Sequence, residues 1–235
     1  MTTLILLRHG RSSANAAGVL AGRTPGVELD ETGRAQAARV VERLAGVPLA
    51  EIVSSPALRC EQTVAPLLAD RGRTVVTEPG LAEVDYGSWT GRELKELGKE
   101  PLWRTVQAHP AGVVFPDGEA MAEMSRRGVA AVRDWDARVA AEHGPDAVWV
   151  AVSHGDVIKA ILADALGMHL DSFQRIMVDP ASFSVVRYTE LRPFVLTSNT
   201  SSGSLAHLRP PARKRGRARR RTSSDAVVGG STGTT

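Results

Sequence analysis

Two short apolar runs, each followed at once by a His-Gly pair, constrain the fold of this chain most strongly. Leu-Ile-Leu-Leu at residues 4–7 leads into Arg-His-Gly, which places a histidine at position 9. Val-Trp-Val-Ala-Val at residues 148–152 leads into Ser-His-Gly, with the histidine at position 154. Such runs are typical of buried strands, and ligands of open α/β sheets bind beyond the carboxyl ends of the strands. We therefore expect His9 and His154 to meet in one pocket.

Apolar β-like runs alternate with helical patterns along the chain. Asp30 can cap a helix because its carboxylate accepts from free backbone N–H groups, and Pro56 can open the next helix. This alternation predicts a three-layer α/β/α fold, with a mostly parallel sheet and helices on both faces. The expected strands cover residues 3–7, 51–54, 74–77, 147–153, 183–188 and 194–197, and the expected helices cover 31–45, 56–71, much of 118–143, and 156–166.

The segment from Tyr86 to Asp117 has mixed patterning and several helix breakers. We expect it to form a lid over the strand ends, inserted in the same domain. Its apolar side chains have two interpretations: they face a substrate with some non-polar surface, or they form a small core of the lid itself. These side chains are Trp89, Trp103, Val113, Val114 and Phe115.

The charge of the chain is divided unevenly between its body and its C-terminal part. The 235 residues carry a formal net charge of +3, yet residues 203–235 hold eight basic residues and one acidic residue. The first 202 residues therefore carry a charge of −4. The basic segment has little apolar content and cannot bury enough surface to fold. We expect one domain over residues 1–202 and a disordered basic tail over 203–235.

Composition also bears on partners and location. A basic tail can bind nucleic acid, but no aromatic residue accompanies the arginines, so a solvated extension is the favoured interpretation. No apolar run approaches the roughly 20 residues needed to span a bilayer, and residues 4–7 are too short for a signal peptide. The single cysteine, Cys60, forms no internal disulfide. We expect a cytoplasmic protein without membrane association.

Cationic side chains are expected to gather at the strand ends. Arg8 directly precedes His9, and Arg59 falls in the first turn of the helix that Pro56 opens. Helix N-termini attract anions, and arginine forks match the oxygens of phosphate. A metal site is the rival interpretation. Arg8 would repel a divalent cation, however, and no ligand pair has the short spacing of a zinc motif, so we expect no metal.

An unprotonated histidine can attack phosphorus. Neighbouring arginines disfavour the imidazolium form of His9, and a backbone carbonyl accepting from one ring nitrogen would fix the tautomer. His9 would then become phosphohistidine, while the arginines and a protonated His154 hold the phosphoryl oxygens. Glu83 is the candidate acid for the leaving alkoxide and the later base for water, and Asp85 is the rival carboxylate. Glu83 can act as an acid only if burial or phosphate charge opposes the arginines.

At these residues the sequence resembles the histidine phosphatase superfamily, which includes cofactor-dependent phosphoglycerate mutases and broad-specificity phosphatases. The resemblance covers roughly residues 1–200, and its motifs stand in the family order. The matching motifs are Leu7-Arg8-His9-Gly10 with Asn15, Ser54-Ser55-Pro56 with Arg59, Gln62 and Thr63, Glu83 with Gly87 and Gly91, and Ser153-His154-Gly155.

The resemblance implies a role for each matching residue. His9 is the phosphorylated nucleophile and Glu83 the proton donor, and no metal is required. The implied phosphate and substrate pocket consists of Arg8, Asn15, Arg23, Arg59, His154 and Gly155, with Arg23 matching more loosely. Arg11 stands where the family usually has an acidic residue, and we expect it to face solvent. We interpret Cys60 as a helix-packing residue.

The predicted activity is hydrolysis of a small phosphorylated metabolite without a metal ion or other cofactor. A phosphomutase that uses the same phosphohistidine, with 2,3-bisphosphoglycerate as its cofactor, is the alternative, because the outcome depends on how well the pocket excludes water. A non-catalytic phosphate-binding module is a third interpretation, which the presence of His9, Glu83 and His154 disfavours. An edge strand near residues 183–188 could pair two copies of the chain in a homodimer.

Overall fold

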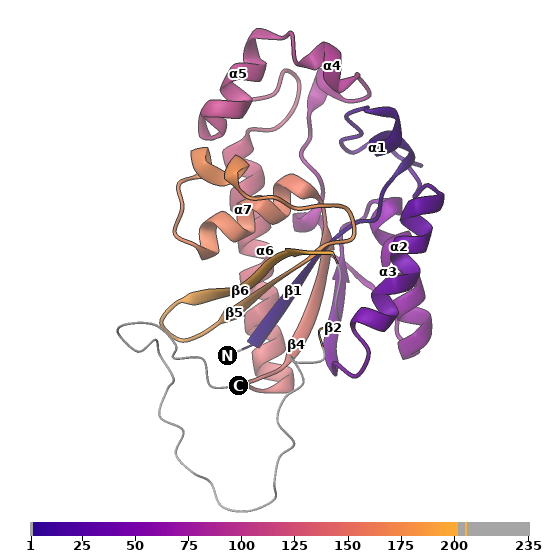
Figure 1. The fold of residues 1–235 in the computed structure, drawn as a ribbon. Coiled ribbons are helices and arrows are strands. Elements are labelled where there is room, and N and C mark those ends of the chain that lie inside the picture. The colour runs from indigo at the N-terminus through magenta and orange to yellow at the C-terminus, as the bar shows by residue number, and fades with distance from the viewer. Residues whose placement is uncertain (1, 202–204, 206–235) are drawn as a thin grey trace, which may run out of the picture.

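A six-stranded sheet with the strand order β3-β2-β4-β1-β5-β6 forms the centre of the molecule (Figure 1). The computed structural model describes residues 2–201 and 205. The first four strands in this order run parallel, and β5 and β6 are antiparallel to their neighbours. The predicted mostly parallel sheet is therefore confirmed. The strands are β1 (Thr2–Arg8), β2 (Leu49–Ser54), β3 (Val76–Thr77), β4 (Val148–Ser153), β5 (Phe183–Tyr188) and β6 (Pro193–Thr200).

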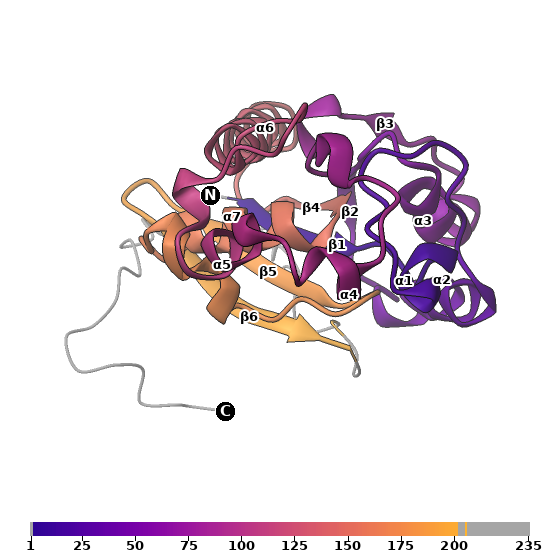
Figure 2. The same ribbon diagram turned by 90° about the horizontal axis from the view of Figure 1, so that it is seen from above.

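Helices cover both faces of the sheet, as predicted (Figure 2). One face carries α2 (Glu31–Arg43) and α3 (Leu58–Arg71), and the other carries α6 (Met121–His143) and α7 (Gly155–Ala165). Successive side chains of a strand point to opposite faces, and β1 divides its apolar residues accordingly. Leu4 and Leu6 pack in the cluster that contains α6 and α7. Ile5 and Leu7 pack in the cluster that contains α2 and α3.

The remaining helices are short and lie mostly in the lid. The segment 86–117 contains the short helices α4 (Leu94–Leu97) and α5 (Pro101–Ala108), which Figure 1 shows above the carboxyl ends of the strands. The 3₁₀ helices of the fold are η1 (Pro79–Leu81), η2 (Gly87–Trp89), η3 (Pro110–Gly112) and η4 (Leu170–Arg175), and α1 (Ser13–Ala17) follows the end of β1. The sequence pattern predicted the lid as a unit but none of these short helices.

Local signals set the helix starts close to their predicted positions. The Asp30 carboxylate accepts from the Gly33 N–H at 2.7 Å and caps α2 as predicted. Helix α3 begins at Leu58, two residues after Pro56, because Ala57 is still extended and serves as the N-cap. Arg59 nevertheless lies in the first turn of α3, which is where the sequence placed it.

One prediction about the sheet is wrong. Residues 183–188 are not an edge strand, because β5 pairs with β1 on one side and with β6 on the other. The short connection between β5 and β6 forces the two strands to pair as a hairpin, which leaves β6 and β3 at the edges. The proposed pairing surface of a homodimer is therefore occupied within the chain, and the homodimer itself stays a prediction.

The predicted disordered tail lies outside the described residues, except for Leu205. The Leu205 side chain is 4% exposed, and its backbone N–H donates to the Arg43 carbonyl at 3.0 Å. In residues 2–201 and 205, none of the helices has the length and apolar character that a membrane crossing requires.

Two glycines allow the loop after His9 to lie against α2. A Cβ atom on Gly33 would lie 2.0 Å from the Arg11 carbonyl oxygen, and one on Gly10 would lie 2.8 Å from the Gly33 oxygen. The neighbours are backbone atoms, so they cannot rotate away.

We therefore expect Gly33→Ala to lower the free energy of unfolding by about 2 kcal/mol, the cost typical of overpacking. Urea unfolding followed by circular dichroism measures this change. Gly112→Ala is the matched control, because a Cβ atom there meets nothing within 4 Å. Equal stability of the two variants would contradict the assigned role of Gly33.

Candidate active site

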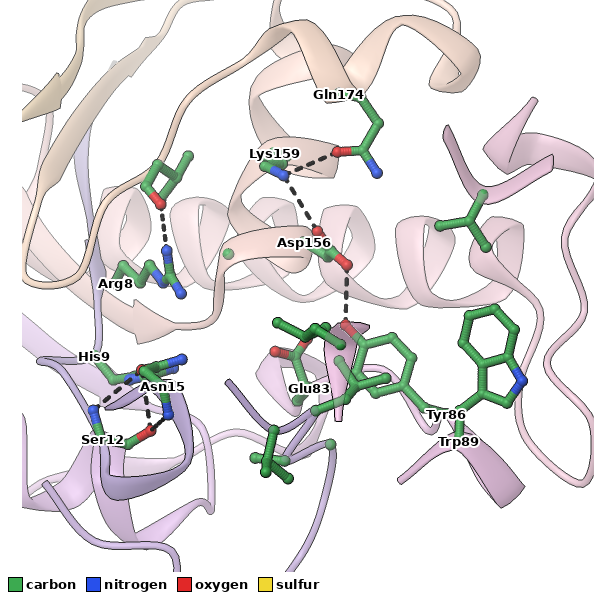
Figure 3. Close-up of a pocket in the computed structure, with 18 of the residues that line it drawn as sticks. Arg8, His9, Ser12, Asn15, Glu83, Tyr86, Trp89, Asp156, Lys159 and Gln174 are labelled. Atoms are coloured by element: carbon green, nitrogen blue, oxygen red, sulfur yellow. Dashed lines mark hydrogen bonds and ion pairs between the residues drawn. The ribbon is translucent and has the colours of Figure 1, made fainter. Parts of the chain in front are cut away.

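A cavity of about 390 Å³ lies at the carboxyl ends of β1 and β4, between the sheet and the lid (Figure 3). His154 lies behind this cavity with a fully buried side chain, and its ring centroid is 5.2 Å from that of His9. The two histidines therefore meet as the two strand ends predicted. Six residues predicted from the sequence line the cavity: Arg8, His9, Asn15, Arg59, Glu83 and Gly155.

The geometry around His9 selects one tautomer. Its Nδ1 lies 2.7 Å from the Gly10 carbonyl oxygen, which can only accept, so Nδ1 carries the proton. The Nε2 atom is left with its lone pair and lies 3.4 Å from the Arg59 Nε donor. Burial, with Arg59 and then Arg8 adding to it, lowers the pKa of His9 to about 3. His9 is therefore neutral at pH 7 and presents an unprotonated nitrogen to the cavity, as predicted.

His154 has the opposite tautomer. Its Nδ1 lies 3.1 Å from Arg59 Nη2, and a guanidinium can only donate, so Nδ1 accepts. The proton is then on Nε2, which donates to Ser55 Oγ at 2.7 Å. Burial and the neighbouring Arg59 hold the pKa of His154 well below its usual value. The expectation of a protonated His154 is therefore wrong for the cavity as described, because a buried ring beside arginine disfavours a charge.

Arg8 and Arg59 place two guanidinium groups around His9. Arg59 is 2% exposed, and its Nη2 also donates to the Gly22 carbonyl at 2.8 Å. Arg8 Nη1 donates to the Val178 carbonyl at 2.6 Å, whereas its buried Nε has no partner among the described residues. Gly155, at the start of α7, lies against this guanidinium, since a Cβ atom there would be 3.5 Å from Arg8 Cζ. An unpaired buried N–H of this kind is suited to bind an anion.

Other residues of the matching motifs hold the loops around His9. Asn15 Oδ1 accepts from the Ser12 backbone N–H at 3.1 Å and forms a capping box with Ser12 at the start of α1. This leaves the amide NH₂ group of Asn15 to donate toward the cavity that it lines. Thr63 Oγ1 accepts from the Gly10 N–H at 2.9 Å, and Gln62 Oε1 accepts from the Leu29 N–H at 2.7 Å.

Glu83, and not Asp85, faces the histidines. Its Oε2 lies 3.8 Å from His154 Nδ1, and its Oε1 accepts from the Val84 N–H at 2.9 Å. Burial, followed by the charge of Asp156, raises the pKa of Glu83 to about 7 and outweighs the opposing arginines. Burial thus allows Glu83 to keep a proton near neutral pH despite the arginines, as an acid at this position requires. The Asp85 carboxylate is 45% exposed and accepts from the Gly87 N–H instead.

Arg23 does not line the cavity but lies behind the Glu83 backbone. Its Nε donates to the Glu83 carbonyl at 2.8 Å, and its Nη2 donates to Glu119 Oε1 at 3.0 Å. Arg127 of α6 donates to the same Glu83 carbonyl at 3.0 Å and also pairs with Glu119 at 2.7 Å. Two guanidinium groups and one carboxylate thus clamp the segment that carries Glu83. Nothing in the sequence pattern indicated this role for Arg127 or Glu119.

The lid supplies an apolar wall of the cavity. The Trp89 and Trp103 rings stack with centroids 6.1 Å apart, and Phe115 packs edge-on against Trp89 at 5.4 Å. All three line the cavity and also belong to the larger hydrophobic cluster or pack against it. These aromatic residues therefore form a small core of the lid and also line the cavity, and their contact with a substrate stays a prediction. Val113 is fully buried, whereas Val114 is 63% exposed.

The two departures from the family pattern have structural explanations. Arg11 faces solvent as predicted, with a side chain that is 45% exposed and paired with Asp30. Cys60 is fully buried in α3, and burial raises the pKa of its thiol to about 12. Cys60 is therefore a packing residue and carries no reactive thiolate at neutral pH.

Several polar side chains of the site were not predicted. Tyr86, Asp156 and Lys159 are among those that line the cavity, and Ser55 accepts from His154. The i, i+3 spacing of Asp156 and Lys159 in the helix after Ser-His-Gly was a usable signal, because it puts both on one face. Within residues 2–201 and 205, no three His, Cys, Asp or Glu side chains are grouped so as to hold a metal ion.

Comparison with known proteins establishes the family. The sequence pattern described as "Histidine phosphatase superfamily (branch 1)" matches residues 4–201, which is most of the chain. The chain belongs to the histidine phosphatase superfamily. Members of this superfamily typically react through a phosphohistidine, which agrees with the exposed lone pair on His9 Nε2 in the cavity.

Relatives within the superfamily include both phosphatases and a mutase. The probable phosphoglycerate mutase GpmB of Yersinia pestis (strain Pestoides F) is 33% identical over 217 residues, which cover 90% of this chain and 97% of the relative. Bacillus stearothermophilus YhfR superposes with a TM-score of 0.77 at 25% identity, and the match covers 88% of this chain and 100% of YhfR. A mycobacterial glucosyl-3-phosphoglycerate phosphatase, solved with VO3, superposes with a TM-score of 0.76 at 27% identity. That match covers 84% of this chain and 98% of the phosphatase. The chain is therefore a histidine phosphatase superfamily enzyme of the phosphatase or mutase kind.

The neutral, buried His9 makes the folded state sensitive to acid. Its folded pKa of about 3 lies below the value of 6.5 for an exposed histidine, so the unfolded chain binds more protons as the pH falls. The stability contribution is complete above about pH 6.5 and is lost progressively toward pH 3.

As the pH falls from 6.5 to 4, the free energy of unfolding of the wild type should decrease by about 3 kcal/mol more than that of His9→Asn. This figure follows from about 1.4 kcal/mol per pKa unit. Chemical unfolding at a series of pH values measures this difference. Parallel stability curves for the two proteins would show that His9 is accessible to protons in the folded state.

Proposed function

We propose that this chain hydrolyses phosphomonoesters through a phosphohistidine on His9. The observation that carries this proposal is the unprotonated Nε2 of a buried histidine between the guanidinium groups of Arg8 and Arg59. Arginines attract the phosphate dianion, and the same charges prevent the protonation that would remove the nucleophile. Asn15 and Gly155 complete the proposed phosphate pocket, and His154 supports it from behind by accepting a hydrogen bond from Arg59.

The first proposed step transfers the phosphoryl group to the enzyme. His9 Nε2 attacks phosphorus, the bond between phosphorus and the ester oxygen breaks, and Glu83 donates its proton to the departing alkoxide. The ring then carries both the phosphoryl group on Nε2 and the proton on Nδ1, and the Gly10 carbonyl stabilises this cation. Arg8 and Arg59 hold the equatorial oxygens as negative charge shifts between them.

The second proposed step returns the enzyme to its starting state. Glu83, now ionised, accepts a proton from a water molecule that attacks the phosphohistidine, and the nitrogen–phosphorus bond breaks. Inorganic phosphate leaves, and His9 regains its lone pair. A pKa near 7 allows Glu83 to serve as the acid in one step and the base in the next.

The apolar wall supports a substrate whose alcohol has a non-polar part. Trp89, Trp103 and Phe115 face the space beyond the phosphate pocket, where they can bury a leaving group. A phosphomutase that is primed by 2,3-bisphosphoglycerate is the second candidate, and the 33% identity to a probable phosphoglycerate mutase favours it. Neither candidate uses a metal ion in the mechanism that we propose, and we place the reaction in the cytoplasm.

The assay that tests the proposal is hydrolysis of p-nitrophenyl phosphate in the presence of EDTA. We expect turnover by the wild type and a loss of at least about a thousandfold for His9→Ala, because the covalent route disappears with the imidazole. Phosphate release that requires added metal, or that persists in His9→Ala, would contradict the mechanism. Conversion of 3-phosphoglycerate to 2-phosphoglycerate only after priming with 2,3-bisphosphoglycerate would favour the mutase.

The role of Glu83 predicts a dependence on the leaving group. Glu83→Gln cannot donate a proton, so we expect it to slow alkyl phosphates by at least about a hundredfold and p-nitrophenyl phosphate much less, because nitrophenolate departs without protonation. Hydrolysis of alkyl phosphates by the wild type should also decline above about pH 7, where Glu83 loses its proton. This decline should be absent in Glu83→Gln. Equal slowing of both substrates would rule out the assigned role.

A further inference from the structure

The cavity has a second polar region, on the opposite side from His9. Figure 3 shows Asp156, Lys159 and Gln174 together there, with Tyr86 beneath Asp156. Tyr86 donates to Asp156 Oδ2 at 2.9 Å, and Lys159 Nζ lies 3.5 Å from Asp156 Oδ1. Lys159 Nζ also donates to Gln174 Oε1 at 3.0 Å. These four side chains form a polar wall of the same cavity that His9 lines.

The charges of this second region cancel or are negative. Beyond Arg8 and Arg59, Lys159 is the one cationic side chain among the described residues that line the cavity, and Asp156 forms an ion pair with it. The lining also includes Asp179, whose carboxylate accepts from Asn199 at 2.8 Å. A second anionic group placed beside Lys159 would therefore meet a lysine that is already paired, and the Asp156 carboxylate of that pair would repel it.

We propose that Asp156 is a specificity residue that selects phosphomonoesters of neutral alcohols and rejects those that carry a second anionic group near the ester. This inference rests on the proposed function. A neutral hydroxyl can donate to the Asp156 carboxylate and accept from the Gln174 amide, whereas a carboxylate in the same place would be repelled. A partly buried cavity strengthens this repulsion, because water screens it less than at the surface.

The helix geometry supports a direct role of this pair. Asp156 and Lys159 are one turn apart in the first half of α7, so they point from one face of the helix. Gly155 precedes Asp156 and lies against the Arg8 guanidinium, which places Asp156 next to the phosphate pocket. The Tyr86 hydrogen bond fixes the second carboxylate oxygen, so Asp156 cannot rotate away from an incoming anion without losing a partner.

Two substrates of nearly equal size test the inference. Glycerol 3-phosphate and 3-phosphoglycerate have the same phosphate ester and differ only in a CH₂OH group against a carboxylate. We expect the wild type to hydrolyse glycerol 3-phosphate with the higher kcat/KM. Asp156→Asn keeps the shape of the side chain and frees the Lys159 charge, so the ratio of the two kcat/KM values should shift by about tenfold toward 3-phosphoglycerate.

The ratio of kcat/KM for the two esters separates an effect on specificity from an effect on catalysis. The charge of Asp156 also raises the pKa of Glu83, so Asp156→Asn alters proton donation, but it does so for both esters alike. Asp179→Asn is the matched control, because it removes a carboxylate of the same cavity that is paired with Asn199 and leaves the Asp156–Lys159 pair intact. This control should leave the ratio nearly unchanged. In the double variant Asp156→Asn/Lys159→Gln, the shift of the kcat/KM ratio toward 3-phosphoglycerate should disappear, because the freed lysine charge is gone.

The outcomes distinguish the two proposals. If the wild type releases phosphate from neither ester nor from p-nitrophenyl phosphate, the proposed function itself fails. If it hydrolyses phosphomonoesters but prefers 3-phosphoglycerate, or if Asp156→Asn leaves the ratio unchanged while its thermal unfolding matches the wild type, the role of Asp156 is overturned and the hydrolase stands.

Discussion

A hydrogen bond between His9 Nδ1 and the Gly10 carbonyl decides what the rest of this structure can do. It fixes the proton on Nδ1 and leaves the Nε2 lone pair directed at the cavity between two arginines. Burial prevents protonation of that nitrogen, which the surrounding positive charge also disfavours. The cations that we propose to hold a phosphate dianion therefore also keep His9 in the unprotonated form that the proposed attack requires. The parallel sheet serves this arrangement by ending β1 and β4 side by side.

Hydrogen bonds hold the proposed acid, Glu83, in place, and they also connect it to His9. Arg59 contacts His9 and donates to the Gly22 carbonyl, and the next residue, Arg23, donates to the Glu83 carbonyl. Arg127 of α6 donates a hydrogen bond to the same carbonyl. Arg59 and the Glu83 carbonyl are thus both hydrogen-bonded to the Gly22–Arg23 segment, which connects the proposed phosphate-binding group to the proposed proton donor. The cavity beyond them combines an aromatic wall with a self-neutralised Asp156–Lys159 pair, and this suits a neutral alcohol.

Sequence alone predicted the elements whose signals are local. Apolar runs ending in His-Gly placed His9 and His154 together, and Pro56 placed Arg59 at a helix start. Contacts between distant segments were out of reach: nothing in the pattern shows that Arg127 reaches back to Glu83 or that Gln174 meets Lys159. Residues 183–188 were misplaced at an edge because strand order is a tertiary property. A protonated His154 was expected because the burial of its ring was unknown.

The most direct test of the account is the identity of the nitrogen that carries the phosphoryl group. The enzyme can be mixed rapidly with ³²P-labelled substrate, quenched in alkali and digested, and the phosphohistidine isomer separated chromatographically. The account predicts label on His9 at Nε2, because Nδ1 is bound to the Gly10 carbonyl. Label at Nδ1, label on another residue, or turnover without any labelled intermediate would contradict it.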